Sequence, residues 1–192
     1  MIRMAKKHDF KPDKTGNGIL SKLYLTATQR RTILKWTLYS MVLLLLSLLQ
    51  DVVLSKVRIN RATTDLVPCA IILICILEGA HKSSVFTLIA SCLFLFSGGA
   101  PGTYCLVFLT ALAILASMIR QNYLANRFTS AMVCAVAAYV LYELLTYAIG
   151  LFLGYTNLAR IQGFLITILM SVPAIPILYP ICVSIGGKSW KE

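Results

Sequence analysis

Apolar residues fall into long runs separated by short polar segments. A continuous run of about 20 apolar residues can cross a bilayer as a helix, whereas the strands of a membrane barrel alternate apolar and polar positions. The pattern therefore predicts an all-α integral membrane protein built as a six-helix transmembrane bundle. The six apolar runs cover residues 36–54, 66–77, 83–96, 103–119, 128–153 and 161–185.

Two runs depart from a simple spanning helix. The second, 66–77, has an unbroken apolar stretch too short for an ordinary span, so it either crosses with little tilt or enters only part of the bilayer. The last run contains Pro173, Pro176 and Pro180, each of which removes an amide donor and predicts a kink or break. Between the third and fourth runs, SGGAPGT at 97–103 predicts a tight hairpin.

Composition excludes an ordinary soluble enzyme. Of the 192 residues 58% are hydrophobic and 13% are charged, about half the charged fraction usual in soluble domains. Six crossings nearly exhaust this length, and the chain has no G-x-S-x-G, H-E-x-x-H or Walker motif. We therefore expect no enzyme and no catalytic residue.

The net charge of +11 is unevenly distributed. A six-helix topology with a cytoplasmic N-terminus places 14 Lys and Arg inside and four outside, which favours cytoplasmic N- and C-termini. We predict a basic tail over 1–35, a transmembrane domain over 36–187 and a short C-terminus over 188–192. The tail is predicted to contact membrane lipids rather than nucleic acid; residues 22–35 are either solvated or an amphipathic surface helix.

All six cysteines lie inside apolar runs without C-x-x-C spacing, and only two histidines are present. They are expected to act as small buried hydrophobic residues. The sequence predicts no bound metal and no cofactor.

Glu143 is the most deeply placed acid, about midway along the fifth run. Tyr139 and Tyr147, four residues to either side, share its helix face. No Lys or Arg in the same run can pair with it, so the carboxyl is a candidate functional group. It is either an anchor facing a partner helix or ligand cavity, or a glutamate satisfied within the bundle by tyrosine hydroxyls and backbone carbonyls.

Three further acids, Asp51, Asp65 and Glu78, lie near the ends of runs, where we expect hydrated surface roles. The sequence gives no sign that two acids converge on one substrate. In the fifth run, small residues mark one face as a site of close helix packing, either within the chain or between subunits; they are Ala131, Ala135 and Ala138.

Four segments resemble the MreD family of integral membrane, shape-determining proteins of bacteria. They are DLVPCAIILICILEG at 65–79, FSGGAPGT at 96–103, LYELL at 141–145 and SVPAIPILYP at 171–180. The chain departs from the family at 92–95, which are all apolar although members often carry an aspartate there. The resemblance implies that these positions are family-like: Asp65, Pro68, Glu78, Gly79, Ser97, Gly98, Gly102, Glu143, Pro173 and Pro180.

The resemblance implies a non-catalytic scaffold in the bacterial cell membrane. Its partners would be MreC, RodA, a class B penicillin-binding transpeptidase and MreB, which together build the lateral cell wall. An alternative is the substrate-binding S component of an energy-coupling-factor vitamin transporter, which is similar in size, charge and six-helix architecture. However, the first run, 36–54, is rich in leucine rather than in the small residues with which S components dock, and the outer loops are short.

Overall fold

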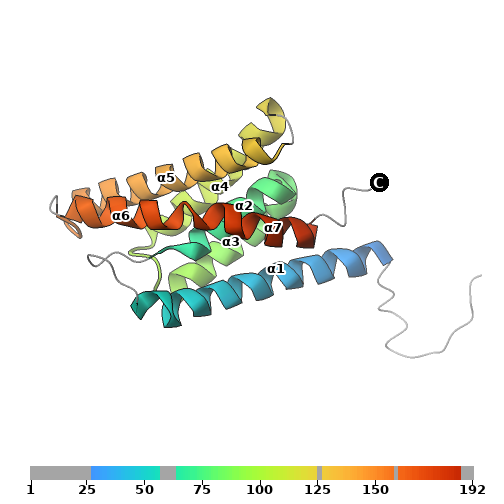
Figure 1. Ribbon diagram of the computed structural model, residues 1–192, viewed down its shortest axis with the longest axis horizontal. Helices are drawn as coiled ribbons and strands as arrows, with labels where there is room; N and C mark the ends of the chain where they lie inside the picture. The colour runs from blue at the N-terminus through green and yellow to red at the C-terminus, as the bar shows by residue number, and fades with distance from the viewer. Residues whose placement is uncertain (1–26, 57–63, 125–126, 158–159, 187–192) are drawn as a thin grey trace, which may run out of the picture. The chain divides into compact units, whose positions relative to one another are not determined.

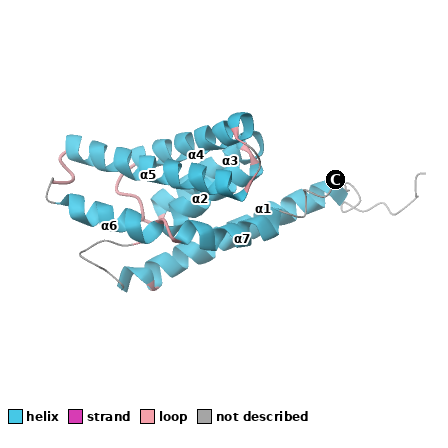
Figure 2. Cartoon of the chain, turned by 45° about the horizontal axis from the view of Figure 1, so that its top comes forward, coloured by secondary structure: helices cyan, strands magenta, loops and turns pink. Residues whose placement is uncertain are grey.

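The computed structural model describes residues 27–56, 64–124, 127–157 and 160–186. The chain divides into two compact units, residues 1–34 and 35–192. In the first unit, only the beginning of a helix is described. The second contains a set of packed helices joined by short loops (Figures 1 and 2).

Helices account for nearly all of the described residues, which contain no strand. This confirms the all-α prediction. A short 3-10 turn at Leu54–Lys56 follows the first helix. The α-helices are α1 (Ala27–Val52), α2 (Leu66–Glu78), α3 (Ala80–Phe96), α4 (Tyr104–Tyr123), α5 (Phe128–Phe152), α6 (Ile161–Ser171) and α7 (Ala174–Gly186).

Three helix boundaries differ from those expected. α1 begins at Ala27, so the predicted end of the tail at residue 35 falls inside a helix, and residues 22–26 lie outside the described part. α3 begins at Ala80 because Gly79, with φ at +92°, makes the corner after α2 in a single residue. α4 continues to Tyr123 because residues 120–123 contain no glycine or proline to end it.

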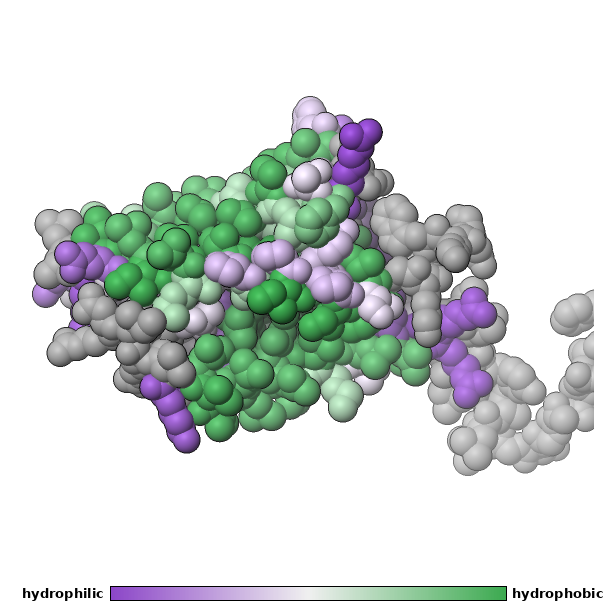
Figure 3. Space-filling view, viewed as in Figure 1, coloured by the Kyte–Doolittle hydropathy of each residue, from purple (hydrophilic) through white to green (hydrophobic). Residues whose placement is uncertain are grey.

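Four helical segments in the described residues are long and apolar enough to cross a membrane, as expected of a multi-pass membrane protein. They cover 29–52, 104–123, 128–152 and 161–186, so α6 and α7 together make one of them. α2 and α3, with 13 and 17 residues, are shorter. Apolar residues cover most of the face in Figure 3, and hydrophilic residues gather mainly near helix ends.

α2 forms the centre of the packed unit. Its residues 67–76 are all buried, which fits a helix that is apolar on every side. It packs against α3, α4, α5 and α7. Five of the six cysteines are also buried, as their apolar surroundings predict.

The last apolar run is broken as its prolines predict. α6 ends at Ser171 and α7 begins at Ala174, so Pro173 lies in the break. Proline cannot donate the amide hydrogen bond that would carry one helix into the next. Pro180 is accommodated inside α7.

Candidate functional site

Gln50, near the end of α1, holds the beginning of α2. Its side-chain oxygen accepts hydrogen bonds from the backbone amides of Leu66, at 3.0 Å, and Val67, at 3.1 Å. The first amides of a helix have no partner within that helix, so here a side chain from another helix supplies one. Gln50 is 8% exposed, and this cap is therefore buried.

Asp65 occupies the N-cap position of α2, yet its side chain makes no capping bond. Its Oδ1 accepts from Gln50 Nε2 at 3.4 Å, and its backbone amide donates to Ser171 Oγ at 2.9 Å. The residue is half-buried, and the hydrated surface role expected for it is wrong. Burial raises the pKa of the Asp65 carboxyl above its ordinary value.

Glu143 meets Asp65 in this cluster. Its Oε1 accepts from the Tyr139 hydroxyl at 3.0 Å, and its carboxyl group lies close enough to that of Asp65 for their charges to interact. Two buried carboxyl groups whose charges interact are not both ionised without a large cost, so one of them keeps a proton. The beginning of α2 favours a negative charge on Asp65, so we place the proton on Glu143. We call Gln50, Asp65, Tyr139, Glu143 and Ser171 the carboxyl-pair cluster.

Tyr147 does not join the carboxyl-pair cluster. Its hydroxyl lies 3.5 Å from the carbonyl oxygen of Asn157, and its ring stacks on Phe164 with 4.9 Å between centroids. Of the two tyrosines predicted to flank Glu143, only Tyr139 contacts it. The structure agrees with the interpretation in which Glu143, 7% exposed, is satisfied within the bundle.

The carboxyl-pair cluster joins residues from α1, α2, α5 and α6 in a buried setting. It can hold one proton and one negative charge. No group of three or more His, Cys, Asp or Glu within the described ranges has metal-binding geometry. The cluster therefore holds these helices together through buried polar contacts, and we refer to this role as a polar lock.

Removing the Gln50 cap tests this lock. Gln50→Leu should lower the free energy of unfolding by about 1–2 kcal/mol, because two buried amides and Asp65 lose a partner. SDS titration of the protein in mixed micelles, followed by circular dichroism, measures this loss. Gln162→Leu, an exposed position on α6, is the matched control and should change stability little. Equal effects of the two substitutions would contradict the lock.

Glu78 forms a second polar cluster at the other end of α2. It makes an ion pair with Lys35, and its Oε1 accepts from the Tyr39 hydroxyl at 2.7 Å. The Glu78 side chain is 7% exposed, so its expected surface role is also wrong. A Cβ added at Gly186 would lie 2.7 Å from the Tyr39 oxygen, so α7 needs glycine here. Asp51, by contrast, is exposed as expected.

The other predicted positions have structural roles. Gly98 turns the chain after α3 with φ at +79°, and Gly102 lies in the loop before α4. The alanine face is buried inside the chain, which agrees with the interpretation of packing within the chain rather than between subunits. Its residues are Ala131, Ala135 and Ala138.

Sequence reasoning missed several residues of both clusters. In the sequence, Gln50 is an amide that interrupts an apolar run. Ser171 and Tyr39 are single polar residues inside such runs, and nothing near them indicates a partner. Lys35 was counted with the basic tail. Comparison with known protein families, with curated proteins and with solved structures finds no match to this chain.

Proposed function

We propose that the protein is a non-catalytic membrane scaffold of the MreD kind, which helps assemble the bacterial cell-wall elongation machinery and maintain cell shape. In this proposal α2 and α3 complete a six-helix transmembrane bundle resembling that of the S components. The N- and C-termini are cytoplasmic, as the distribution of Lys and Arg favours. The partners are MreC, RodA, a class B penicillin-binding transpeptidase and MreB.

The observation that most directly supports this proposal is the position of the family-like residues. Asp65 and Glu143 come from separate segments of the resemblance, yet their carboxyl groups lie close enough for their charges to interact. Ser171, which begins a third segment, bonds the Asp65 amide. These three segments are related in the sequence only by the resemblance to one family. In the structure they meet in the carboxyl-pair cluster, which supports a shared structural role.

Two further observations support a scaffold over a vitamin carrier. The centre of the packed helices is filled by residues 67–76 of α2, which are all buried and leave no room there for a vitamin. α1 is the least buried of the four long helical segments. It presents exposed Met41, Leu45 and Leu48, a surface suited to a partner helix.

The test is affinity purification of the tagged protein from its native membranes in mild detergent, followed by mass spectrometry. We expect to recover MreC, RodA or a transpeptidase. Leu45→Trp on α1 should reduce this recovery, whereas Leu169→Trp, equally apolar and exposed on α6, should not. Recovery of paired ATPases and their membrane coupling subunit would instead establish the transporter alternative.

A further inference from the structure

A polar pocket of about 380 Å³ opens where α2 ends, α3 begins and α4 ends. This is the end of α2 opposite the carboxyl-pair cluster. Its polar lining comes from Glu78, Gly79, His81, Lys82, Arg120 and Gln121. His81 and Lys82 are exposed, so the pocket is open to ligands from outside.

Arg120 brings a buried positive charge to this pocket. The residue is 5% exposed, and its Nη1 donates to the backbone carbonyl of Ile76 at 2.8 Å. Within the described part of the chain, Nε has no hydrogen-bond partner and no carboxylate pairs with the guanidinium. Capping of α2 therefore uses only part of the hydrogen-bonding capacity of Arg120.

The beginning of α3 adds a second positive element. α3 has 17 residues and starts against the pocket, with no side chain capping its first turn. The amides of Lys82 and Ser83 bond to the Gly79 carbonyl, which leaves those of Ala80 and His81 without a helical partner. A helix N-terminus of this kind favours an anion.

Glu78 does not cancel these charges. One of its carboxylate oxygens pairs with Lys35 and the other accepts from Tyr39, so its negative charge is already compensated. Lys82 and Arg120 then leave the pocket positive. A buried arginine, an exposed lysine and free helix amides together form a site for a phosphate group.

The location of the pocket indicates the source of that phosphate. α4 is one of the candidate membrane spans, and the pocket lies at the end of it, where lipid headgroups are found. Met118 and Ile119, which precede Arg120 on α4 and so lie toward the bilayer centre, are 50% and 40% exposed and offer an apolar surface for acyl chains. Basic pockets between helices at this depth suit anionic headgroups. We infer that this pocket binds the phosphate group of an anionic phospholipid.

Native mass spectrometry of the full-length protein from nanodiscs tests the inference. The nanodiscs contain equal amounts of phosphatidylglycerol and phosphatidylcholine, and a separate sample receives inorganic phosphate alone. We expect selective retention of phosphatidylglycerol. Lys82→Gln should weaken it about fivefold, the effect of one surface charge on an anionic lipid. Arg120→Gln should weaken it further.

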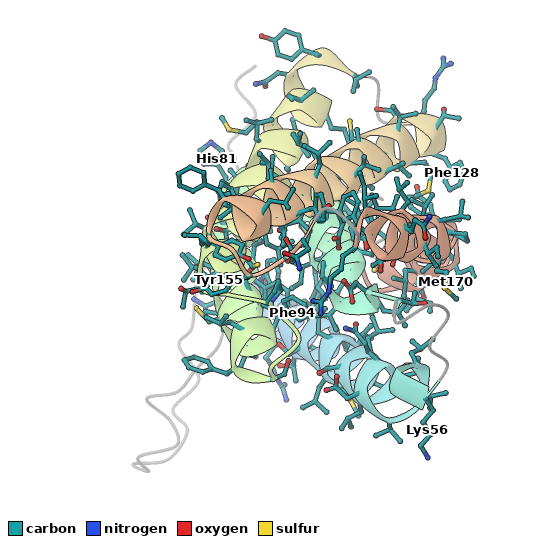
Figure 4. All side chains as sticks on the ribbon, turned by 90° about the vertical axis from the view of Figure 1, so that its left-hand side faces the viewer. Lys56, His81, Phe94, Phe128, Tyr155 and Met170 are labelled. Carbon is teal, nitrogen blue, oxygen red and sulfur yellow. The ribbon has the colours of Figure 1, made fainter. Side chains whose placement is uncertain are left out.

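The control is Lys56→Gln, which removes the same charge from an exposed position well away from His81 (Figure 4). It should leave lipid retention unchanged. Because Arg120→Gln also removes a cap from α2, Lys82→Gln decides the outcome if the arginine variant fails to fold. Equal retention of both lipids, equal losses in Lys82→Gln and Lys56→Gln, or binding of inorganic phosphate without selectivity for phosphatidylglycerol would each overturn the inference.

Discussion

Glu143→Ala is expected to lower the free energy of unfolding by about 3 kcal/mol. The substitution removes a buried side chain and leaves the Tyr139 hydroxyl without its partner. Loss of a buried hydrogen-bonded group, together with the space it filled, has an effect of this size. SDS titration of the purified protein in mixed micelles measures it.

Glu143→Gln separates hydrogen bonding from charge. The amide can still accept from Tyr139 and, like a protonated carboxyl group, carries no charge, so this variant should lie within about 1 kcal/mol of the wild type. Leu144→Ala, next along α5 and 51% exposed, controls for truncation of the helix surface. A loss in Glu143→Gln as large as that in Glu143→Ala would show that an ionised carboxylate is required, contrary to our assignment of the proton.

Glu78→Met is expected to lower the free energy of unfolding by about 2 kcal/mol. It leaves the Lys35 ammonium and the Tyr39 hydroxyl without the carboxylate that holds both. Removing one partner of a buried ion pair is strongly destabilising, because the other charge is left without a counter-charge. The loss is smaller than for a fully buried pair because Lys35 remains 19% exposed and can be hydrated.

The double variant Lys35→Met with Glu78→Met is the matched test of the ion pair. Replacing both charges by apolar side chains removes the unpaired ammonium, so the double variant should recover about 1 kcal/mol relative to Glu78→Met. The same SDS titration compares the four proteins. Additive losses from the two single substitutions would show that Lys35 and Glu78 are not coupled.

The helices could be predicted from sequence because each is encoded by a local pattern. The apolar runs located α2 and α5 to within one residue, and the prolines located the break between α6 and α7. The predicted helix ends were wrong where polar residues continue a helix, as at the end of α4. α3 is longer than predicted, because Gly79 alone makes the corner after α2, where a longer turn was expected.

The clusters could not be predicted because they depend on contacts between distant segments. Asp65 and Glu143 each lie beside apolar residues that give no sign of the other. Position near the end of an apolar run suggested hydration for Asp65 and Glu78, but α2 is packed among other helices, and both residues are only partly exposed. Burial of a whole helix is a tertiary property that its own residues suggest only through their uniform apolarity.

The two ends of α2 are completed at different times during synthesis. Gln50, which caps the beginning of α2, precedes it in the chain and is made before it. Arg120, whose guanidinium bonds the Ile76 carbonyl near its other end, is encoded 44 residues after that carbonyl. Exposed helix ends are costly in lipid, and 13 residues reach only about 20 Å of a hydrocarbon layer roughly 30 Å thick. In the proposed six-helix bundle, insertion of α2 is therefore complete only after α4 has been synthesised, so this central helix settles after two helices that follow it in the chain, α3 and α4.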